Sequence, residues 1–181
     1  MANLGVKGLT IILGIDPGSR VTGYGVVRME RNKSVHLASG CIEVGDLAFE
    51  RRLCVIFDAL TEVARTYQPE EAAIEKVFMS RNVDSALKLG HARGVAIVAI
   101  AKLEIPVHEY SPNEIKQAIV GRGHADKTQV QQMVKTLLSL AQVPRVDAAD
   151  ALAIAMCHGH TRQGLQAVRR ALGTRAAGRY L

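Results

Sequence analysis

Four carboxylates stand at positions where a negative charge is costly unless a cation neutralises it. Asp16 and Glu75 each follow a short apolar run that is typical of a buried strand. Asp147 and Asp150 are three residues apart at the start of a long apolar stretch, so on a helix they share one face. A carboxylate at the edge of an apolar core is destabilised without compensation. The pattern therefore indicates a site for divalent cations.

This set of carboxylates suits a particular chemistry. Mg²⁺ takes carboxylate oxygens by preference, and two such ions are a common means of cutting a phosphodiester. Each acid also has a simpler reading: the helical pair could cap a helix N-terminus, the first acid could belong to a Pro-Gly turn, and Glu75 could pair with Lys76 or Arg81. A metal-dependent nuclease explains all four acids at once.

Composition limits the class of protein. A chain of 181 residues with 48% hydrophobic residues is most simply one domain. Its three cysteines have no CxxC spacing, so we expect neither a disulfide framework nor a zinc site built on them, and a reducing, cytoplasmic setting. The first ten residues do not resemble a secretory signal, and the longest apolar runs are too short to span a membrane.

The charge is unevenly distributed along the chain. The formal net charge is +6, but residues 162–181 hold five arginines and no acid, so the rest is nearly neutral. We therefore divide the chain into an N-terminal extension, 1–9, a nuclease domain, 10–161, and a basic, flexible C-terminal tail, 162–181. The tail is either a solvated end or an arm that contacts phosphates.

The elements that must position the acids follow from periodicity and turn residues. Strands are predicted over 10–16, 22–28 and 34–44, with a further strand ending at Glu75. Between the third and fourth strands, apolar residues recur at helical spacing from residue 49 to 67. Asp46 could cap this helix, and Pro69 stops it.

The second half of the chain is predicted to be mostly helical. A helix over 81–102, capped by Ser80 or Asn82, contains Gly90 and Gly94, which we expect to allow close approach of another element. A short strand, 105–109, follows. The last three helices are predicted to begin at Ser111, Asp126 and Asp147. This order favours an α/β fold with one mixed sheet covered by helices.

Five blocks of sequence resemble the RuvC family of Holliday-junction resolvases. They read ILGIDPGSRVTGYG at 12–25, AIEKVF at 73–78, SALKLG at 85–90, ARGV at 92–95 and DAADALA at 147–153. The resemblance implies an RNase H-like fold, with a five-stranded sheet made of an antiparallel meander plus parallel strands and flanked by helices. It also implies symmetric nicking of four-way DNA junctions by a homodimer that works with a branch-migration helicase complex of the RuvA and RuvB type.

The same resemblance assigns roles to individual residues. Asp16, Glu75, Asp147 and Asp150 match the family's catalytic metal ligands, with two Mg²⁺ per site and Mn²⁺ as a substitute. Phe78 is either a wedge that stacks on bases at the junction centre or a hydrophobic staple at a helix start. The remaining candidates for DNA contact are Lys116, Lys127, Arg81 and Arg122.

Two histidines close to the end of the domain, His158 and His160, could bind a metal. No third ligand lies near them in the sequence. We therefore interpret the pair as part of a solvated helix end.

Overall fold

The core of the fold is one five-stranded sheet. The computed structural model describes residues 9–31, 33–76, 82–121, 123 and 125–177. The order of strands is β3-β2-β1-β4-β5. Their bounds are Leu9–Asp16 for β1, Val21–Glu30 for β2, Lys33–Glu43 for β3, Glu71–Glu75 for β4 and Val107–Tyr110 for β5.

The sheet is mixed, as the sequence predicts. β1, β2 and β3 pair antiparallel and form a meander, whereas β4 runs parallel to β1 and β5 runs parallel to β4. Parallel neighbours end at the same edge of a sheet, so β1 and β4 bring their carboxyl ends together.

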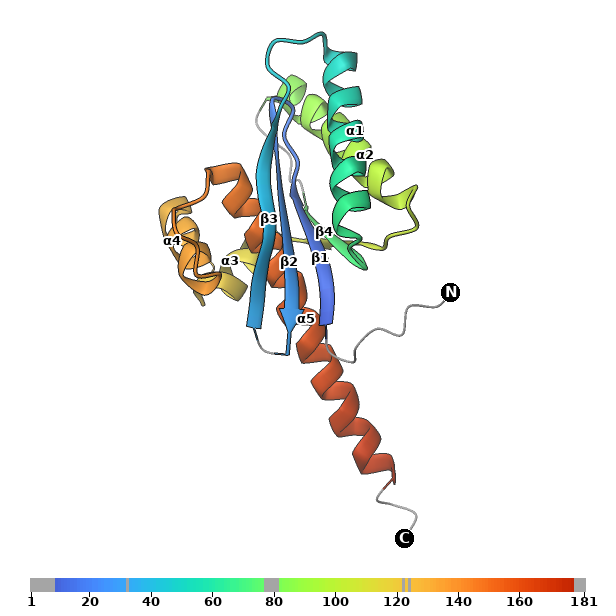
Figure 1. Ribbon diagram of the computed structural model, residues 1–181, viewed down its shortest axis with the longest axis vertical. Helices are drawn as coiled ribbons and strands as arrows, with labels where there is room; N and C mark the ends of the chain where they lie inside the picture. The colour runs from blue at the N-terminus through green and yellow to red at the C-terminus, as the bar shows by residue number, and fades with distance from the viewer. Residues whose placement is uncertain (1–8, 32, 77–81, 122, 124, 178–181) are drawn as a thin grey trace.

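Helices cover both faces of the sheet (Figure 1). On one face lie α1 and α2; α3, α4 and α5 lie on the other. Side chains alternate accordingly along β1, where Ile12 packs under α5 and Leu13 packs under α1 and α2. The helices span Phe49–Tyr67 for α1, Val83–Ala101 for α2, Pro112–Val120 for α3, Lys127–Leu137 for α4 and Val146–Ala177 for α5.

Helix starts that rest on local hydrogen bonds agree with the sequence. Ser111 and Asp126 each form a capping box, and Asn82 accepts a hydrogen bond from the backbone at the start of α2. The bounds predicted for α1 are confirmed, but the cap that we expected at Asp46 was wrong. Its N-cap is Ala48, and Asp46 instead accepts a hydrogen bond from Arg20 at 2.7 Å. The Asp46 carboxylate therefore pairs with the Arg20 guanidinium and does not cap the helix.

The last helix is longer than the predicted domain. α5 continues past residue 161 to Ala177, and its end projects beyond the sheet (Figure 1). Arg162, assigned to the tail from sequence, donates to Glu71 and to Thr10, both at 2.8 Å. The first turn of the expected tail is thus held by the sheet. Within the described part of the chain, no helix combines the length and apolar character needed to cross a membrane.

Candidate metal centre and nucleic-acid interface

Asp16 and Glu75 are neighbours on adjacent strands. The parallel register pairs Ile15 with Ile74, so the next residue of each strand stands beside its counterpart at the carboxyl edge. Both acids alternate with residues that pack on α1 and α2, and they therefore face α5. The strand ends thus place two of the four acids side by side under the start of a helix.

Glycines in the sheet let α5 approach closely enough to bring the other two acids. A Cβ atom built on Gly23 would lie 2.0 Å from the backbone oxygen of Asp147, and one on Gly14 would lie 2.0 Å from that of Ala151. Such distances are far inside van der Waals contact. The helix can therefore rest on the sheet only because these positions lack side chains.

The sequence analysis missed the role of these glycines. The signal was present, since Gly14 stands two residues before Asp16, and Gly23 faces Asp16 across the β1–β2 pair. What the sequence could not indicate is which helix lies on them. The contact with Asp147 and Ala151 makes the glycines part of the site, because they set the distance between α5 and the strand ends.

The four acids form one electrostatic unit. Burial raises the pKa of Asp16 to about 8, and the charges of Asp150, Glu75 and Asp147 act in the same direction. Burial also raises the pKa of Glu75, again with a contribution from Asp150, and burial raises that of Asp150. Negative charge is therefore unfavourable here unless cations compensate it.

Two lysines partly supply that compensation. Lys127, at the start of α4, has its Nζ atom 3.8 Å from Oδ2 of Asp150. The charge of Lys116 on α3 opposes, without cancelling, the rise that burial causes in the pKa values of Glu75 and Asp150. The structure thus brings both predicted DNA-contacting lysines to the acidic site.

Three other predicted contacts cannot be placed. Phe78, Arg81 and Arg122 lie outside the described residues. Phe78 therefore remains, as in the sequence analysis, either a wedge at the junction centre or a hydrophobic staple.

Arg93 on α2 holds the backbone of the strand that carries Glu75. Its Nε atom donates to the carbonyl oxygen of Glu75 at 3.2 Å, and its guanidinium pairs with Glu109 on β5 at 2.5 Å. The side chain of Arg93 is 20% exposed. One cation therefore ties together the ends of two parallel strands, at the residue whose carboxylate belongs to the acidic site.

If the acids cleave DNA as the sequence predicts, we expect Arg93→Met to slow this cleavage without weakening DNA binding. Loss of the guanidinium frees the carbonyl of Glu75 and releases Glu109, so the Glu75 carboxylate is positioned less accurately. A displacement of about 1 Å can cost about 100-fold in rate. Single-turnover rates with prebound DNA measure the effect. Lys88→Met, which removes an exposed ion pair with Asp84 on the same helix, is the matched control; an equal loss in both variants would contradict a positioning role for Arg93.

Comparison with known proteins identifies a family that matches most of the chain. The family model described as "Crossover junction endodeoxyribonuclease RuvC" matches residues 12–158. A protein of that description from Shewanella sp. (strain W3-18-1) is 53% identical over 172 residues, covering 95% of this chain and 99% of its own. One from Pseudoalteromonas translucida is 58% identical over 157 residues, covering 87% of this chain and 90% of its own.

A solved structure is similar over nearly its whole length. "T. thermophilus RuvC in complex with Holliday junction substrate" superposes with a TM-score of 0.80 at 36% identity, covering 86% of this chain and 96% of that one. The range matched by the family model contains all four acids, both lysines and the glycines that seat α5.

Proposed function

We infer the chemistry of the acidic site from one premise: the chain belongs to the RuvC family of crossover junction endodeoxyribonucleases. It is accordingly a Holliday junction resolvase with an RNase H-like fold, a hydrolase that cuts DNA phosphodiester bonds. We propose that Asp16, Glu75, Asp147 and Asp150 are its catalytic residues. The observation that carries this proposal is their convergence from β1, β4 and α5 beneath one sheet edge.

The donor set fits Mg²⁺. All four side chains offer carboxylate oxygens, the ligands this ion prefers. The pKa of Asp16, raised to about 8 by burial and by its acidic neighbours, indicates more negative charge than the nearby lysines offset. Two divalent ions would supply the missing charge. Mn²⁺, which also accepts carboxylate ligands, is expected to substitute.

Each acid has a distinct place in the proposed site. Asp16, on the central strand β1, would contribute to holding both ions. Glu75 and Asp150 would each help to hold one ion, and Asp147 would complete the cluster or orient the attacking water. Ions bound in this way would lower the pKa of that water and stabilise the leaving 3′ oxygen.

The lysines act on the DNA. The ammonium group of Lys127, beside Asp150, can approach a phosphate at the acids and offset charge that develops during cleavage. Lys116 adds positive charge on the same side. Phe78 is proposed as a further contact to the four-way junction on the basis of the family resemblance, and Arg81 and Arg122 are proposed as basic candidates from the sequence alone.

One experiment tests the assignment. The purified protein with Mg²⁺ is offered a four-way junction, a linear duplex and a single strand of matched sequence. We expect paired nicks in the junction and little cutting of the other two. Equal cutting of all three substrates would refute the junction-specific mechanism, and cutting that persists after chelation of divalent metal would refute the role of the acids as metal ligands.

The surface of α2 supports a homodimer. Leu87 is 59% exposed and Val98 is 51% exposed, and they line an apolar groove with Gly90 and Gly94, bordered by Phe57 of α1. No atom of the described chain lies within 4 Å of a Cβ built on either glycine, so the element that we expect to approach them is not within the described chain. We propose that a second copy of the chain covers this groove.

We expect Leu87→Asp to separate the dimer into monomers. A charge placed in an apolar interface loses its hydration without gaining a partner. The monomer would nick one strand of a junction at a time, because paired cuts on a two-fold junction need two sites related by a two-fold axis. Light scattering and a supercoiled cruciform assay measure the two effects. Leu172→Asp, at a leucine 61% exposed on α5, is the control; dimers that survive Leu87→Asp would exclude this interface.

The remaining family features are proposed without a structural test. We place the protein in the cytoplasm with its DNA, acting with a branch-migration helicase complex of the RuvA and RuvB type. Residues 10–161 are proposed as the nuclease domain, and residues 162–181 as a separate basic segment that begins within α5.

A further inference from the structure

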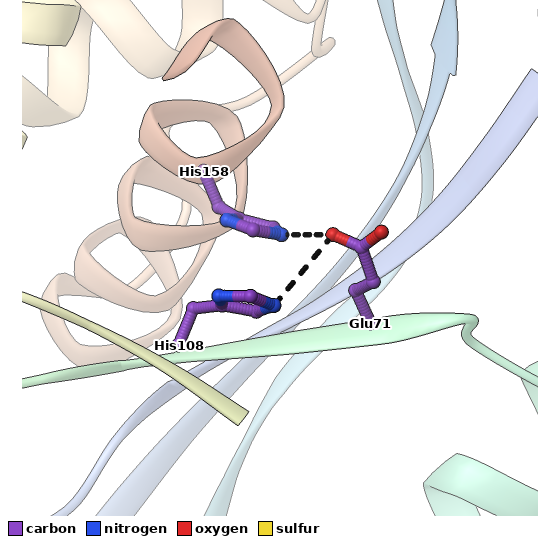
Figure 2. A group of neighbouring side chains, drawn as sticks. All are labelled: Glu71, His108 and His158. Carbon is purple, nitrogen blue, oxygen red and sulfur yellow. Dashed lines mark hydrogen bonds and ion pairs between the residues drawn. The ribbon is translucent and has the colours of Figure 1, made fainter. Parts of the chain in front are cut away.

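A second group of ligand-type side chains meets beneath α5, away from the four acids. Glu71 from β4, His108 from β5 and His158 from α5 converge from three elements (Figure 2). One potential ligand atom of each lies within 4.8 Å of the other two. Among the described residues, no other group of His, Cys, Asp and Glu meets this condition.

Both histidines direct their Nε2 atoms towards the same oxygen, Oε2 of Glu71. The Nε2 atom of His158 is 2.5 Å from Oε2 of Glu71, and that of His108 is 3.8 Å from the same oxygen. The two imidazole rings are stacked, with centroids 4.3 Å apart and planes 23° apart, so their Nε2 atoms point the same way (Figure 2). The sequence-based interpretation of His158 as part of a solvated helix end was wrong, since the residue is 3% exposed.

The cluster has the outer contacts that orient metal ligands. Nδ1 of His158 is 2.7 Å from the hydroxyl of Tyr110, and Arg162 donates to Oε1 of Glu71 at 2.8 Å. Ligating histidines usually bond through their other ring nitrogen, and ligating carboxylates are held in turn by donors. Arg162 contacts Oε1, so the other oxygen, Oε2, is the one that faces both histidines and would be the ligand atom.

A hydrogen-bond network alone accounts for only part of this arrangement. At 3.8 Å, His108 is too far from Glu71 for a hydrogen bond, and in the part of the chain that the structure describes its ring makes none. Protonating both stacked rings would place two positive charges face to face. Burial, opposed by Glu71 and assisted by His108, lowers the pKa of His158 and favours the neutral imidazole that metals bind.

We propose that Glu71, His108 and His158 bind a transition-metal ion, of which Zn²⁺ is the best match to two imidazoles and a carboxylate. Such ligands suit zinc and its first-row neighbours, whereas Mg²⁺ prefers oxygen donors. The side chain of His108 is 45% exposed and gives the ion a path from solvent. A water molecule would complete four-coordination.

Small movements would form the site. Metal–ligand distances of about 2.0–2.2 Å in a tetrahedron place neighbouring ligand atoms about 3.4 Å apart. The two histidine–glutamate distances of 2.5 and 3.8 Å would therefore change by about 0.9 and 0.4 Å respectively. The guanidinium of Arg162 opposes a cation, so we expect binding weaker than at thiolate zinc sites.

The proposed ion would join α5 to β4 and β5 at the opposite end from the catalytic acids. Glu71 and Glu75 bound the five-residue strand β4, which separates them by about 13 Å at about 3.3 Å per residue. The ion would therefore hold the helix in place without competing with Mg²⁺ for ligands. Its role is structural and independent of the proposed cleavage mechanism.

Zinc titration in saturating Mg²⁺ tests the proposal. Calorimetry of the full chain is expected to show one Zn²⁺ bound per chain, with a higher unfolding temperature on binding. His108→Phe keeps a stacked ring but removes a ligand, and Glu71→Gln removes the carboxylate charge. Each should weaken binding by about 100-fold or more, since losing even an outer-shell partner costs roughly 10–100-fold.

Matched variants identify where the ion binds. His91→Phe changes an exposed histidine on α2, and Cys54→Ser removes an exposed thiol; both should bind Zn²⁺ as the parent does. Co²⁺ in place of Zn²⁺ should show visible absorption that is lost in His108→Phe. Equal affinity of His108→Phe and the parent would overturn the proposal, as would the absence of zinc uptake by the parent. A cooperative unfolding transition, recorded without metal, confirms that each variant is folded.

Discussion

Replacement of Asp150 by asparagine is expected to abolish junction cleavage while leaving binding without metal unchanged or stronger. The amide nearly preserves the shape of the side chain but removes a charge that a metal would neutralise. It also removes repulsion from Asp147 and from Asp16. We expect the rate to fall by about 10³-fold or more, since a bound ion supplies several kcal/mol and about 1.4 kcal/mol is a tenfold change.

Two measurements on this variant separate catalysis from folding. Junction affinity in chelator and the single-turnover rate in Mg²⁺ are compared with those of Asp58→Asn, which changes an exposed aspartate on α1. The control should match the parent in both. Clear loss of affinity in Asp150→Asn without metal would mean that this acid is structural, and the assignment of the site would be wrong.

Gly23→Ala is expected to damage stability and cleavage together. The added Cβ would lie 2.0 Å from the backbone oxygen of Asp147 and 3.2 Å from the backbone nitrogen of Ala148. Backbone atoms cannot rotate away, so the start of α5 must move off the sheet. We expect a loss of about 3 kcal/mol in the free energy of unfolding, at the upper end for overpacking, and a fall in rate of about 100-fold per ångström of displacement.

A glycine on the same helix provides the control. A Cβ built on Gly164 of α5 meets no atom within 4 Å, so Gly164→Ala should raise stability by about 0.5–1 kcal/mol through helix propensity. Chemical denaturation and single-turnover cleavage are measured on both variants. If Gly23→Ala retained the parent's rate and stability, the glycine contact could not be what sets the distance between α5 and the strand ends.

Features that depend on neighbours in sequence were predictable from sequence. The capping boxes at Ser111 and Asp126 join residues three apart, and the apolar runs before Asp16 and Glu75 are indeed strands. The mixed sheet of a meander plus parallel strands was also expected, but the order of its strands came from the structure. The family blocks supplied the four acids as candidates before any fold was known.

Features that depend on residues far apart in the sequence could not be predicted from it. Asp46 binds Arg20 in place of the helix start, and His158 is bound to Glu71, 87 residues away. The two histidines of the HxH run look like a pair along the chain. In the fold, His158 of α5 instead stacks on His108 of β5.

The sequence by itself determined the elements and the family, and it supplied the four carboxylates as candidates for the site, because short-range periodicity and ordered motifs carry that information. The tertiary structure decided how near the carboxylates lie and what else gathers beneath α5. The physical reason is that glycines such as Gly14 and Gly23 act only through the backbone placed on them. Likewise, Glu71, His108 and His158 become a group only when three elements are packed against one another. Such contacts leave no periodic trace along the chain.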